Sequence, residues 1–286
     1  MIQDFTLHTH TNEFDGRNTA AEMIEAARAS GFKTIGISNH FIVHPTIKQN
    51  PLYEAAVRGG YGQMYSSDFD EALSRFVPHY EELARLQDKN PDIRILRGME
   101  VDYFPTDQWR DGFERVYNIL RPDYLIGSAH FVEQGGAVYN VHDMAKATPD
   151  VRDQMLEQYW ANIIKLAQSG LFNWLAHLDL PKKRGLGMES KWAGVKEEAI
   201  VAIVNAKNAI EINTSGYKQV GDQPYPGPDI IKMVAVYRVP VLLSDDAHHI
   251  SQIAASFETA YDMARQNGIK NFTNLQKILD FSKKSL

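Results

Sequence analysis

The chain of 286 residues contains no cysteine. This absence excludes disulfide bridges, thiolate metal sites and cysteine nucleophiles, so nitrogen and oxygen atoms must provide any metal ligands. The chain also lacks an apolar run that approaches the ~20 residues of a membrane-spanning helix. Its first residues, MIQDFTLHTH, do not combine a basic segment with an apolar core, as a secretory signal does. We therefore expect a cytoplasmic protein with no membrane partner.

An excess of basic residues is missing as well. The formal net charge is −6, with 30 Lys and Arg against 36 Asp and Glu. This balance argues against a nucleic-acid partner but is compatible with a small anionic substrate. Low-complexity linkers and repeats of fixed period are also absent from the sequence. Residues 1–286 are therefore predicted to form a single domain.

Apolar segments alternate with helical patterns along the chain. Segments that read as buried strands are 2–7, 33–38, 93–99, 123–128, 171–176, 208–213 and 239–243. Helical patterns cover 19–30, 68–89, 106–120, 149–169, 193–206 and 227–237, and the tail adds a helix at 250–267, an apolar piece at 270–272 and a helix at 273–284. This alternation predicts an α/β fold, either a parallel barrel or a doubly wound sheet.

The stretch 41–67 interrupts this alternation. It is rich in Pro, Gly, Tyr and Asn and is too long for an ordinary connection. Because long loops in compact domains are often functional, we expect this stretch to be a loop over the active site.

Metal-ligand residue types recur where the predicted strands end. The stretch FTLHTHTNEFDG places two histidines either side of one threonine, and alternate residues of a strand share a face. The strand ends and the first loop together supply His8, His10, Asp15, His40, Glu100, His130, His177, Asp246 and His248. In a parallel barrel these ends lie on one face, where such folds build active sites. The pattern predicts a metal site, with His40 at the end of the strand 33–38.

Four histidines fall outside this pattern: His44, His79, His142 and His249. We expect them to be surface residues or residues that support the ligands. His44 lies in the predicted loop and is a candidate for contact with substrate.

The motifs TLHTHTNEFDG, IGISNH, GMEVD, SAHF, HLDL and SDDAH resemble the successive motifs of the PHP (polymerase and histidinol phosphatase) superfamily. Residues 210–248 are most similar to its histidinol-phosphate phosphatase branch. The resemblance covers essentially the whole chain. It implies a distorted (β/α)7 barrel of the PHP type, and a centre of three divalent metal ions.

The resemblance also implies three ligand sets. The first is His8, His10, Glu100 and Asp246; the second is Glu100, His130 and His177, with the carboxylate bridging two ions; the third is Asp15, His40 and His248. A carboxylate has two oxygens and can bridge, whereas an imidazole offers one lone pair to an ion. This mixture of nitrogen and oxygen favours zinc, manganese or iron over magnesium or calcium.

Two departures from the family pattern concern the ligand motifs. An aspartate pair, Asp245 and Asp246, stands where the family usually has one; alignment on Ala247 and His248 favours Asp246 as the ligand. Asn39 stands before His40 where the family more often has aspartate, and we expect it to support the ligands.

The predicted reaction is hydrolysis of a phosphate monoester, with L-histidinol phosphate as the expected substrate. Ions of this kind bring the pKa of bound water to about 7, so a hydroxide is available as nucleophile. Asp15, Glu100 and His248 are the expected catalytic residues; a metal-bound water, Asp15 or His249 is a candidate leaving-group acid. No serine lies in a G-x-S-x-G elbow, so a serine nucleophile is not expected. Basic residues expected at the substrate phosphate are Arg17, Lys182, Arg184 and Lys218.

Other functions remain open at this point. A PHP hydrolase acting on another small phosphate ester or on nucleotides would share the same metal ligands. A metal-binding PHP module without activity would be expected to have lost ligands. An amidohydrolase-type barrel that cleaves C–N bonds also begins with an H-x-H strand, but it usually needs a bridging lysine, and Glu100 occupies that place.

Overall fold

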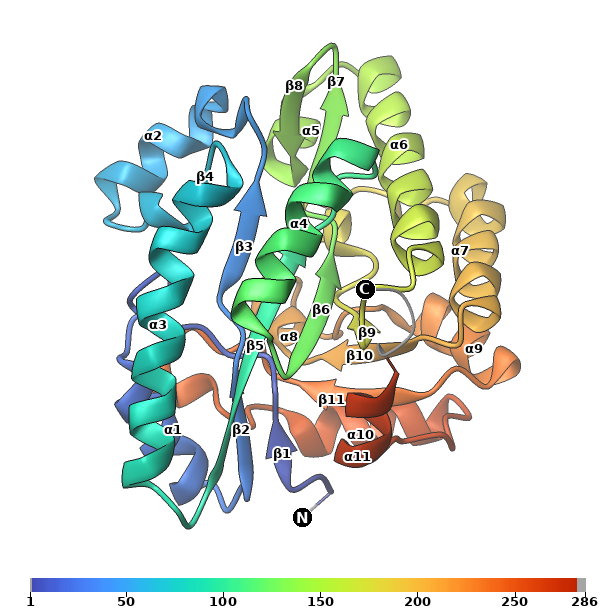
Figure 1. Ribbon diagram of the computed structural model, residues 1–286. Coiled ribbons are helices and arrows are strands. Elements are labelled where there is room, and N and C mark those ends of the chain that lie inside the picture. The colour runs from blue at the N-terminus through green and yellow to red at the C-terminus, as the bar shows by residue number, and fades with distance from the viewer. Residues whose placement is uncertain (1, 282–286) are drawn as a thin grey trace. The chain divides into compact units, whose positions relative to one another are not determined.

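The computed structural model describes residues 2–281 (Figure 1). Contacts within the chain divide it into two compact units. The first unit runs to Ile126 and includes Asp245–Ala255, and the second comprises Gly127–Ser244 and continues from Ser256. The expectation of a single domain stays a prediction. Among the described residues no helix has both the length and the apolar character needed to cross a bilayer.

The first unit is built on parallel strands. Strand β2 (Thr34–Ile37) lies between β1 (Phe5–Thr6) and β5 (Arg94–Asp102). Strand β3 (His40–Val43) pairs in parallel with the end of β5 and with β4 (Tyr65–Ser66). Helices of this unit are α1 (Ala20–Ala29), α2 (Pro51–Arg58), α3 (Phe69–Lys89) and α4 (Asp107–Leu120), with short turns η1 (Ile47–Gln49), η2 (Gly62–Met64) and η5 (Ile250–Gln252).

Helices α1 and α3 illustrate how the sequence sets these elements. The hydroxyl of Thr19 accepts from the backbone of Glu22, whose carboxylate accepts from Thr19 in return, which makes a capping box at the start of α1. Helix α3 starts at the side-chain cap of Asp68. Its buried side chains recur at helical spacing, and the helix packs against β3 and β5 (Figure 1). The buried face of α3 therefore supports β3 and β5, the strands that carry His40 and Glu100.

Tyr124 fixes the spacing of the first strands. A Cβ at Gly36 would lie 2.1 Å from the hydroxyl of Tyr124, and a Cβ at Gly98 would lie 2.1 Å from Cζ of its ring, so only glycine leaves room for this side chain. The hydroxyl of Tyr124 donates a hydrogen bond to the carbonyl of Leu7, the residue before His8. Burial of this tyrosine thus anchors the end of the first strand.

The second unit has its own parallel strands, β9 (Trp174–Leu175), β10 (Ala209–Asn213) and β11 (Val241–Ser244), with β10 in the middle. A hairpin of β7 (Phe131–Gln134) and β8 (Ala137–Asn140) turns at Gly135 and Gly136, both at positive φ. Strand β6 (Tyr124–Ser128) begins in the first unit and ends in the second.

Some helices of the second unit pack on its strands and others on neighbouring helices, and α6 and α7 lie side by side in Figure 1. They are α5 (Val141–Lys146), α6 (Pro149–Gln168), α7 (Ala193–Asn205), α8 (Ser215–Gln219), α9 (Pro228–Tyr237), α10 (Phe257–Gln266) and α11 (Leu275–Asp280), with short turns η3 (Leu180–Arg184) and η4 (Ser190–Trp192). Proline at the first position of α6 and of α9 marks where each helix begins.

All seven predicted strands are present, so the expected strand–helix alternation is confirmed. Two predictions are wrong in detail. His40 does not end the strand 33–38 but begins β3, and the helix expected at 250–267 begins only at Phe257. At 270–272 only Phe272 forms a bridge, with Val241. The last helix was expected to reach 284, and 282–284 lie outside the described residues.

The stretch 41–67 is folded rather than an irregular loop, because it contains most of β3, then η1, α2, η2 and β4. Arg75 of α3 holds it by donating to the carbonyl oxygens of Gln63 and Tyr65. Its role over the active site stays a prediction.

Candidate metal centre

The segment Asp245–Ala255 lies against the end of the first strand. The amide of His10 donates to the carbonyl of Ala247 at 2.9 Å, and the amide of Ala247 donates to the carbonyl of His8 at 3.1 Å. Thr9 and Ala247 form a parallel bridge. The two histidines of the H-x-H motif and the SDDAH motif, far apart in sequence, therefore belong to one site within the first unit.

A first group of possible ligands consists of His8, His10, Glu100 and Asp246. Nε2 of His8 lies 3.2 Å from Oε2 of Glu100 and 3.6 Å from Oδ1 of Asp246. Nε2 of His10 lies 3.5 Å and 3.2 Å from the same two oxygens. The structure thus brings together all four residues of the first predicted ligand set.

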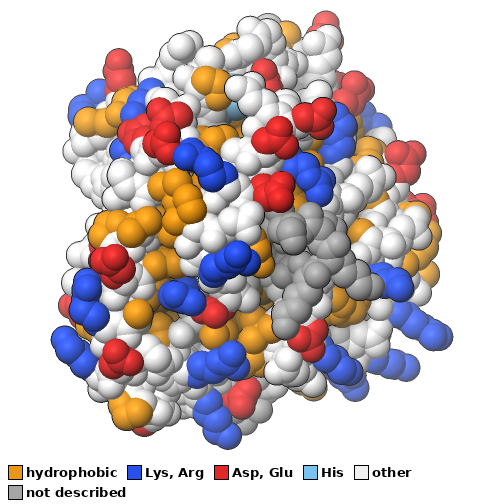
Figure 2. All heavy atoms as spheres, in the orientation of Figure 1, with side chains coloured by type: hydrophobic (Ala, Val, Ile, Leu, Met, Phe, Trp, Pro, Cys, Tyr) orange, Lys and Arg blue, Asp and Glu red, His pale blue; other side chains and the backbone are white. Residues whose placement is uncertain are grey.

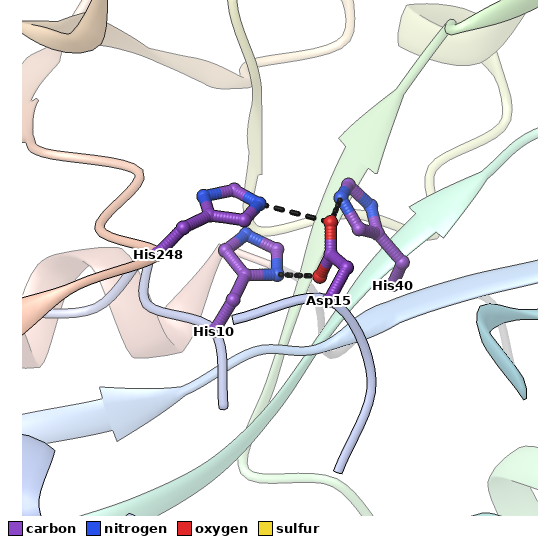
Figure 3. Close-up of side chains that lie close together, drawn as sticks. All are labelled: His10, Asp15, His40 and His248. Atoms are coloured by element: carbon purple, nitrogen blue, oxygen red, sulfur yellow. Dashed lines mark hydrogen bonds and ion pairs between the residues drawn. The ribbon is translucent and has the colours of Figure 1, made fainter. Parts of the chain in front are cut away.

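A second group consists of His10, Asp15, His40 and His248 (Figure 3). Oδ2 of Asp15 lies 3.3 Å from Nε2 of His40 and 3.0 Å from Nε2 of His248, and Oδ1 lies 3.6 Å from Nδ1 of His10. The rings of His10 and His248 stack with centroids 4.1 Å apart. The third predicted set is thus assembled around Asp15, and His10 lies between the two groups.

The separations between the donor atoms suit shared coordination of a metal ion better than direct hydrogen bonds between the side chains. Two ligands at bonds of about 2.1 Å in tetrahedral geometry are separated by about 3.4 Å, close to the separations of 3.2 to 3.6 Å found here. Within residues 2–281, both ring nitrogens of His10 and Oδ1 of Asp15 are buried without a hydrogen-bond partner. Buried polar atoms are rarely left so, and an ion would satisfy them.

The charges of these side chains favour the binding of a cation. Burial and the neighbouring His248 and His40 lower the pKa of His10 to about 4, so its imidazole is neutral at pH 7 and can act as a ligand. Burial opposes ionisation of Asp15, but His248 and His40 outweigh it and hold the pKa of Asp15 well below its usual value. Burial likewise opposes the charge on His248, yet Asp15 and Asp246 raise its pKa to about 9. Protons thus occupy places that an ion would take.

Asp245 and Asp246 have different surroundings. Oδ1 of Asp246 lies near His8 and His10, and the residue has a positive φ of 48°. Asp245 accepts from the hydroxyl of Thr6 at 3.0 Å and from the amide of Ala254 at 2.8 Å, and burial raises the pKa of Asp245 to about 7. Asp246 therefore lies in the ligand group, whereas Asp245 holds the returning segment.

The remaining predicted ligands lie in the second unit, while Glu100 of the same set lies in the first. The rings of His130 and His177 have centroids 4.8 Å apart. His177 has a positive φ of 21°, and its amide donates to Glu211 at 3.2 Å. Glu211 is fully buried on β10 and also accepts from Trp174 and Asn213. Glu211 is absent from the residues that the sequence pattern predicts for the site, and its only signal is a charged residue within the apolar strand segment 208–213.

The basic residues expected at a phosphate differ in exposure. Arg17, Arg184 and Lys218 are exposed. The guanidinium of Arg184 contacts the ring of His142, and the amide of Arg17 donates to the carbonyl of His248. Lys182 is buried, and its ammonium lies 3.0 Å from Asp179 and donates to the carbonyl of Pro224. A long cationic side chain is thus already paired inside the second unit.

Of the histidines outside the ligand pattern, His142 and His249 are partly exposed, as expected. His44 is buried beside Phe104, with ring centroids 4.7 Å apart. His79 is buried on α3 and contacts Glu13 and Asn39, which lie close to the ligands in sequence.

Comparison with known proteins places this geometry in a family. Residues 4–215 match the PHP domain, so the chain belongs to the PHP domain family. A probable histidinol-phosphatase from Deinococcus radiodurans is 30% identical over 214 residues, which cover 73% of this chain and 79% of that protein. A probable histidinol-phosphatase from Schizosaccharomyces pombe is 22% identical, with coverage of 94% and 89%.

Two solved structures have the same fold. The histidinol phosphate phosphatase of Lactococcus lactis, solved with zinc, L-histidinol and phosphate, superposes with a TM-score of 0.73 at 17% identity, covering 97% of this chain and 98% of that one. A putative histidinol phosphatase from Listeria monocytogenes gives a TM-score of 0.69 at 18% identity, with coverage of 89% and 99%. These similarities confirm the expected fold class, the PHP-type α/β barrel.

Proposed function

We propose that the chain is a metal-dependent phosphomonoesterase that hydrolyses L-histidinol phosphate to L-histidinol and phosphate. The observation that carries this proposal is the convergence of seven ligand-type side chains in the first unit: His8, His10, Asp15, His40, Glu100, Asp246 and His248. Membership of the PHP family and the names of its relatives direct the choice of substrate.

The proposed cofactor is three divalent ions, of zinc, manganese or iron. One would be held by His8, His10, Glu100 and Asp246, one by Asp15, His40 and His248, and one by Glu100, His130 and His177. When bound, such ions make water a nucleophile at neutral pH and neutralise charge on phosphoryl oxygens. Zinc in the Lactococcus lactis structure supports the use of a divalent metal.

The proposed catalytic residues act by holding charge and protons in place. Glu100 is fully buried and lies within 3.5 Å of three imidazoles, so its carboxylate is fixed at the centre of the site. Asp15 lies within 3.0 Å of Nε2 of His248, a geometry in which a proton can be held between carboxylate and imidazole. Asp15 and a water bound at the metal site are the proposed candidates for giving a proton to the leaving alcohol. His249 remains a further candidate for that step.

The substrate phosphate is proposed to meet a basic side chain, for which Arg17, Arg184 and Lys218 are exposed candidates. Lys182 stays a candidate, although Asp179 already pairs with its ammonium. A cytoplasmic location remains part of the proposal.

A second candidate function is hydrolysis of another small phosphate ester or a nucleotide with the same ions. The net charge of −6 argues against a polynucleotide, and on the face seen in Figure 2 acidic side chains lie among the basic ones. An amidohydrolase-type reaction is the least supported, because Glu100 stands where a bridging lysine would be needed.

The test is steady-state hydrolysis of L-histidinol phosphate beside other phosphomonoesters and nucleotides, with metal content measured on the same preparation. A kcat/KM for L-histidinol phosphate far above the others, with about three ions per chain, is the expected result. Three ions with another preferred ester would keep the reaction class and discard the substrate. Absence of bound ions and of turnover after addition of zinc, manganese or iron would overturn the proposal.

A further inference from the structure

His79 is a buried histidine that the proposed reaction does not use. It lies on the inner face of α3 with 3% of its surface exposed. Its ring meets Phe14 and Phe76 edge-on, at centroid distances of 5.7 and 6.2 Å. Two polar side chains contact its two ring nitrogens: Nδ1 contacts the carboxylate of Glu13, and Nε2 lies 3.1 Å from Nδ2 of Asn39.

The hydrogen bonds around Asn39 fix the direction of this chain of contacts. The amide N–H of Thr11 can only donate, so the side-chain oxygen of Asn39, 2.8 Å away, must accept. The amide nitrogen of Asn39 therefore faces His79 and donates to Nε2. A neutral imidazole that accepts at Nε2 carries its proton on Nδ1, from which it donates to Glu13. The amide nitrogen of Asn39 also donates to the hydroxyl of Thr11 at 3.0 Å, so all side-chain polar atoms of His79 and Asn39 have matched partners.

Each end of this chain lies beside a proposed ligand in sequence. Asn39 precedes His40 and holds Thr11, which follows His10. Glu13 lies two residues before Asp15. The carbonyl of Thr11 accepts from Phe14 at 3.0 Å and from Gly16 at 2.9 Å, which closes the turn that carries Asp15. One side chain of α3 therefore connects the backbone segments of three of the four residues drawn in Figure 3.

We propose that His79 is a positioning residue for the metal ion held by Asp15, His40 and His248, and that it acts through the Glu13–His79–Asn39 relay. This inference rests on the proposed metal-dependent function. Residues that orient ligands from outside the coordination sphere typically contribute 10–100-fold to metal affinity. A histidine buried only to fill the core would affect stability without selecting one ion.

The test uses the full chain stripped of metal and titrated with Zn²⁺ or Mn²⁺ against a chromophoric chelator. His79→Phe keeps the ring packing and removes both hydrogen bonds. His79→Gln places an amide near the Nε2 position and keeps the link to Asn39, and His79→Asn does the same near Nδ1 for Glu13. Tyr80→Phe is the matched control, because Tyr80 is the next residue of α3, is buried, and donates to the carbonyl of Gly98.

We expect His79→Phe to weaken the binding of one ion by roughly 10–100-fold and to leave the affinities of the other ions unchanged. In steady-state assays with L-histidinol phosphate, kcat should fall while KM changes little. At least one of the two amide variants should recover part of this affinity, and Tyr80→Phe should bind all ions like the wild type. The relay would be overturned if His79→Phe bound every ion with wild-type affinity, or if it weakened the binding of every ion equally. It would also be overturned if neither amide variant restored any of the lost affinity. A wild-type chain that binds no ions would instead remove the proposed function, and the relay with it.

Discussion

His40 and Glu100 lie opposite each other where β3 pairs with β5, and Nδ1 of His40 is 2.8 Å from Oε2 of Glu100. The same oxygen lies 3.2 Å from Nε2 of His8 and 3.5 Å from Nε2 of His10. Three imidazoles from two separate segments therefore surround one buried carboxylate oxygen. The parallel register of β3 on β5 produces this arrangement, because it places the first residue of one strand beside the seventh of the other.

Replacement of Glu100 by glutamine tests its central place. The amide has the same size but no negative charge and a weaker ligand oxygen, so the site should lose metal. We expect kcat for L-histidinol phosphate to fall at least roughly 100-fold, since even residues outside the coordination sphere contribute 10–100-fold to affinity. Metal content and steady-state rates measured after a chelator wash would show this. Glu25→Gln, an exposed change on α1, is the control; full metal content in Glu100→Gln would contradict the assignment.

The two adjacent aspartates should give opposite results when each is changed to asparagine. Asp246→Asn removes an oxygen beside His8 and His10, and we expect loss of metal and activity. Asp245→Asn leaves one acceptor oxygen where Thr6 and Ala254 each donate to a carboxylate oxygen, so one buried hydrogen bond is lost. That change should lower the free energy of unfolding of the stripped protein by about 1–3 kcal/mol. Urea unfolding and metal analysis of both variants would reveal a reversed assignment.

The stability of the stripped protein should depend on His248 at alkaline pH. Burial disfavours its charge, but Asp15 and Asp246 raise the pKa to about 9. A raised pKa means that the folded state favours the protonated form. This contribution is complete below the unfolded pKa of about 6.5 and is lost as the pH rises through about 9. His10, whose pKa burial lowers to about 4, changes the stability only on the acid side of this window.

Urea unfolding in the presence of a chelator, at several pH values between 6.5 and 9, measures this effect. The free energy of unfolding should fall with pH in the wild type and fall less in His248→Gln. Parallel pH profiles for the two proteins would refute the role of His248. Metal-loaded wild type serves as the control, because an ion takes the lone pairs that those protons occupy.

The sequence was sufficient to predict strands and ligand types because both leave local patterns. Buried strands such as β6 and β11 are nearly continuous apolar runs, and predicted ligands follow shortly after them, His130 after β6 and Asp246 after β11. The H-x-H spacing predicts that the imidazoles of His8 and His10 lie on the same face of an extended chain. Asp246 could be preferred over Asp245 only by resemblance, but the structure gives a physical reason, since Asp245 is held by Thr6 and Ala254.

What the sequence could not predict depends on contacts between distant segments. His40 begins a strand only because it pairs with Glu100 of β5 and the residues after it pair with β5 and β4, and no local pattern records those partners. The stretch 41–67 has the composition of a loop, yet its short elements are held by Arg75 of α3. In the sequence His79 is an ordinary residue of a helical pattern, and only the fold places Asn39 beside it. In the same way Glu211 is a lone charge in an apolar strand segment, and only the fold places the amide of His177 beside it.

Lys182 provides a final test, because sequence and structure suggest different roles for it. Its position after HLDL predicts contact with substrate phosphate, whereas its ammonium is buried against Asp179 and the carbonyl of Pro224. Removing one partner of a buried ion pair leaves the other charge uncompensated, at a cost of about 3–5 kcal/mol. Lys182→Met should therefore lower the free energy of urea unfolding by that amount, and the double variant with Asp179→Leu should recover part of it.

Lys218→Met is the matched control, since Lys218 is exposed and its loss should change stability by no more than about 0.5 kcal/mol. The deciding experiment measures two quantities for Lys182→Met and the wild type: the free energy of urea unfolding, and KM for L-histidinol phosphate in the metal-loaded enzyme. A Lys182→Met protein as stable as the wild type, with a raised KM, would assign the side chain to substrate. The expected loss of stability with KM unchanged would mean that the ammonium joins the segment after His177 to the segment around Pro224, and that the phosphate must be met by the exposed cations.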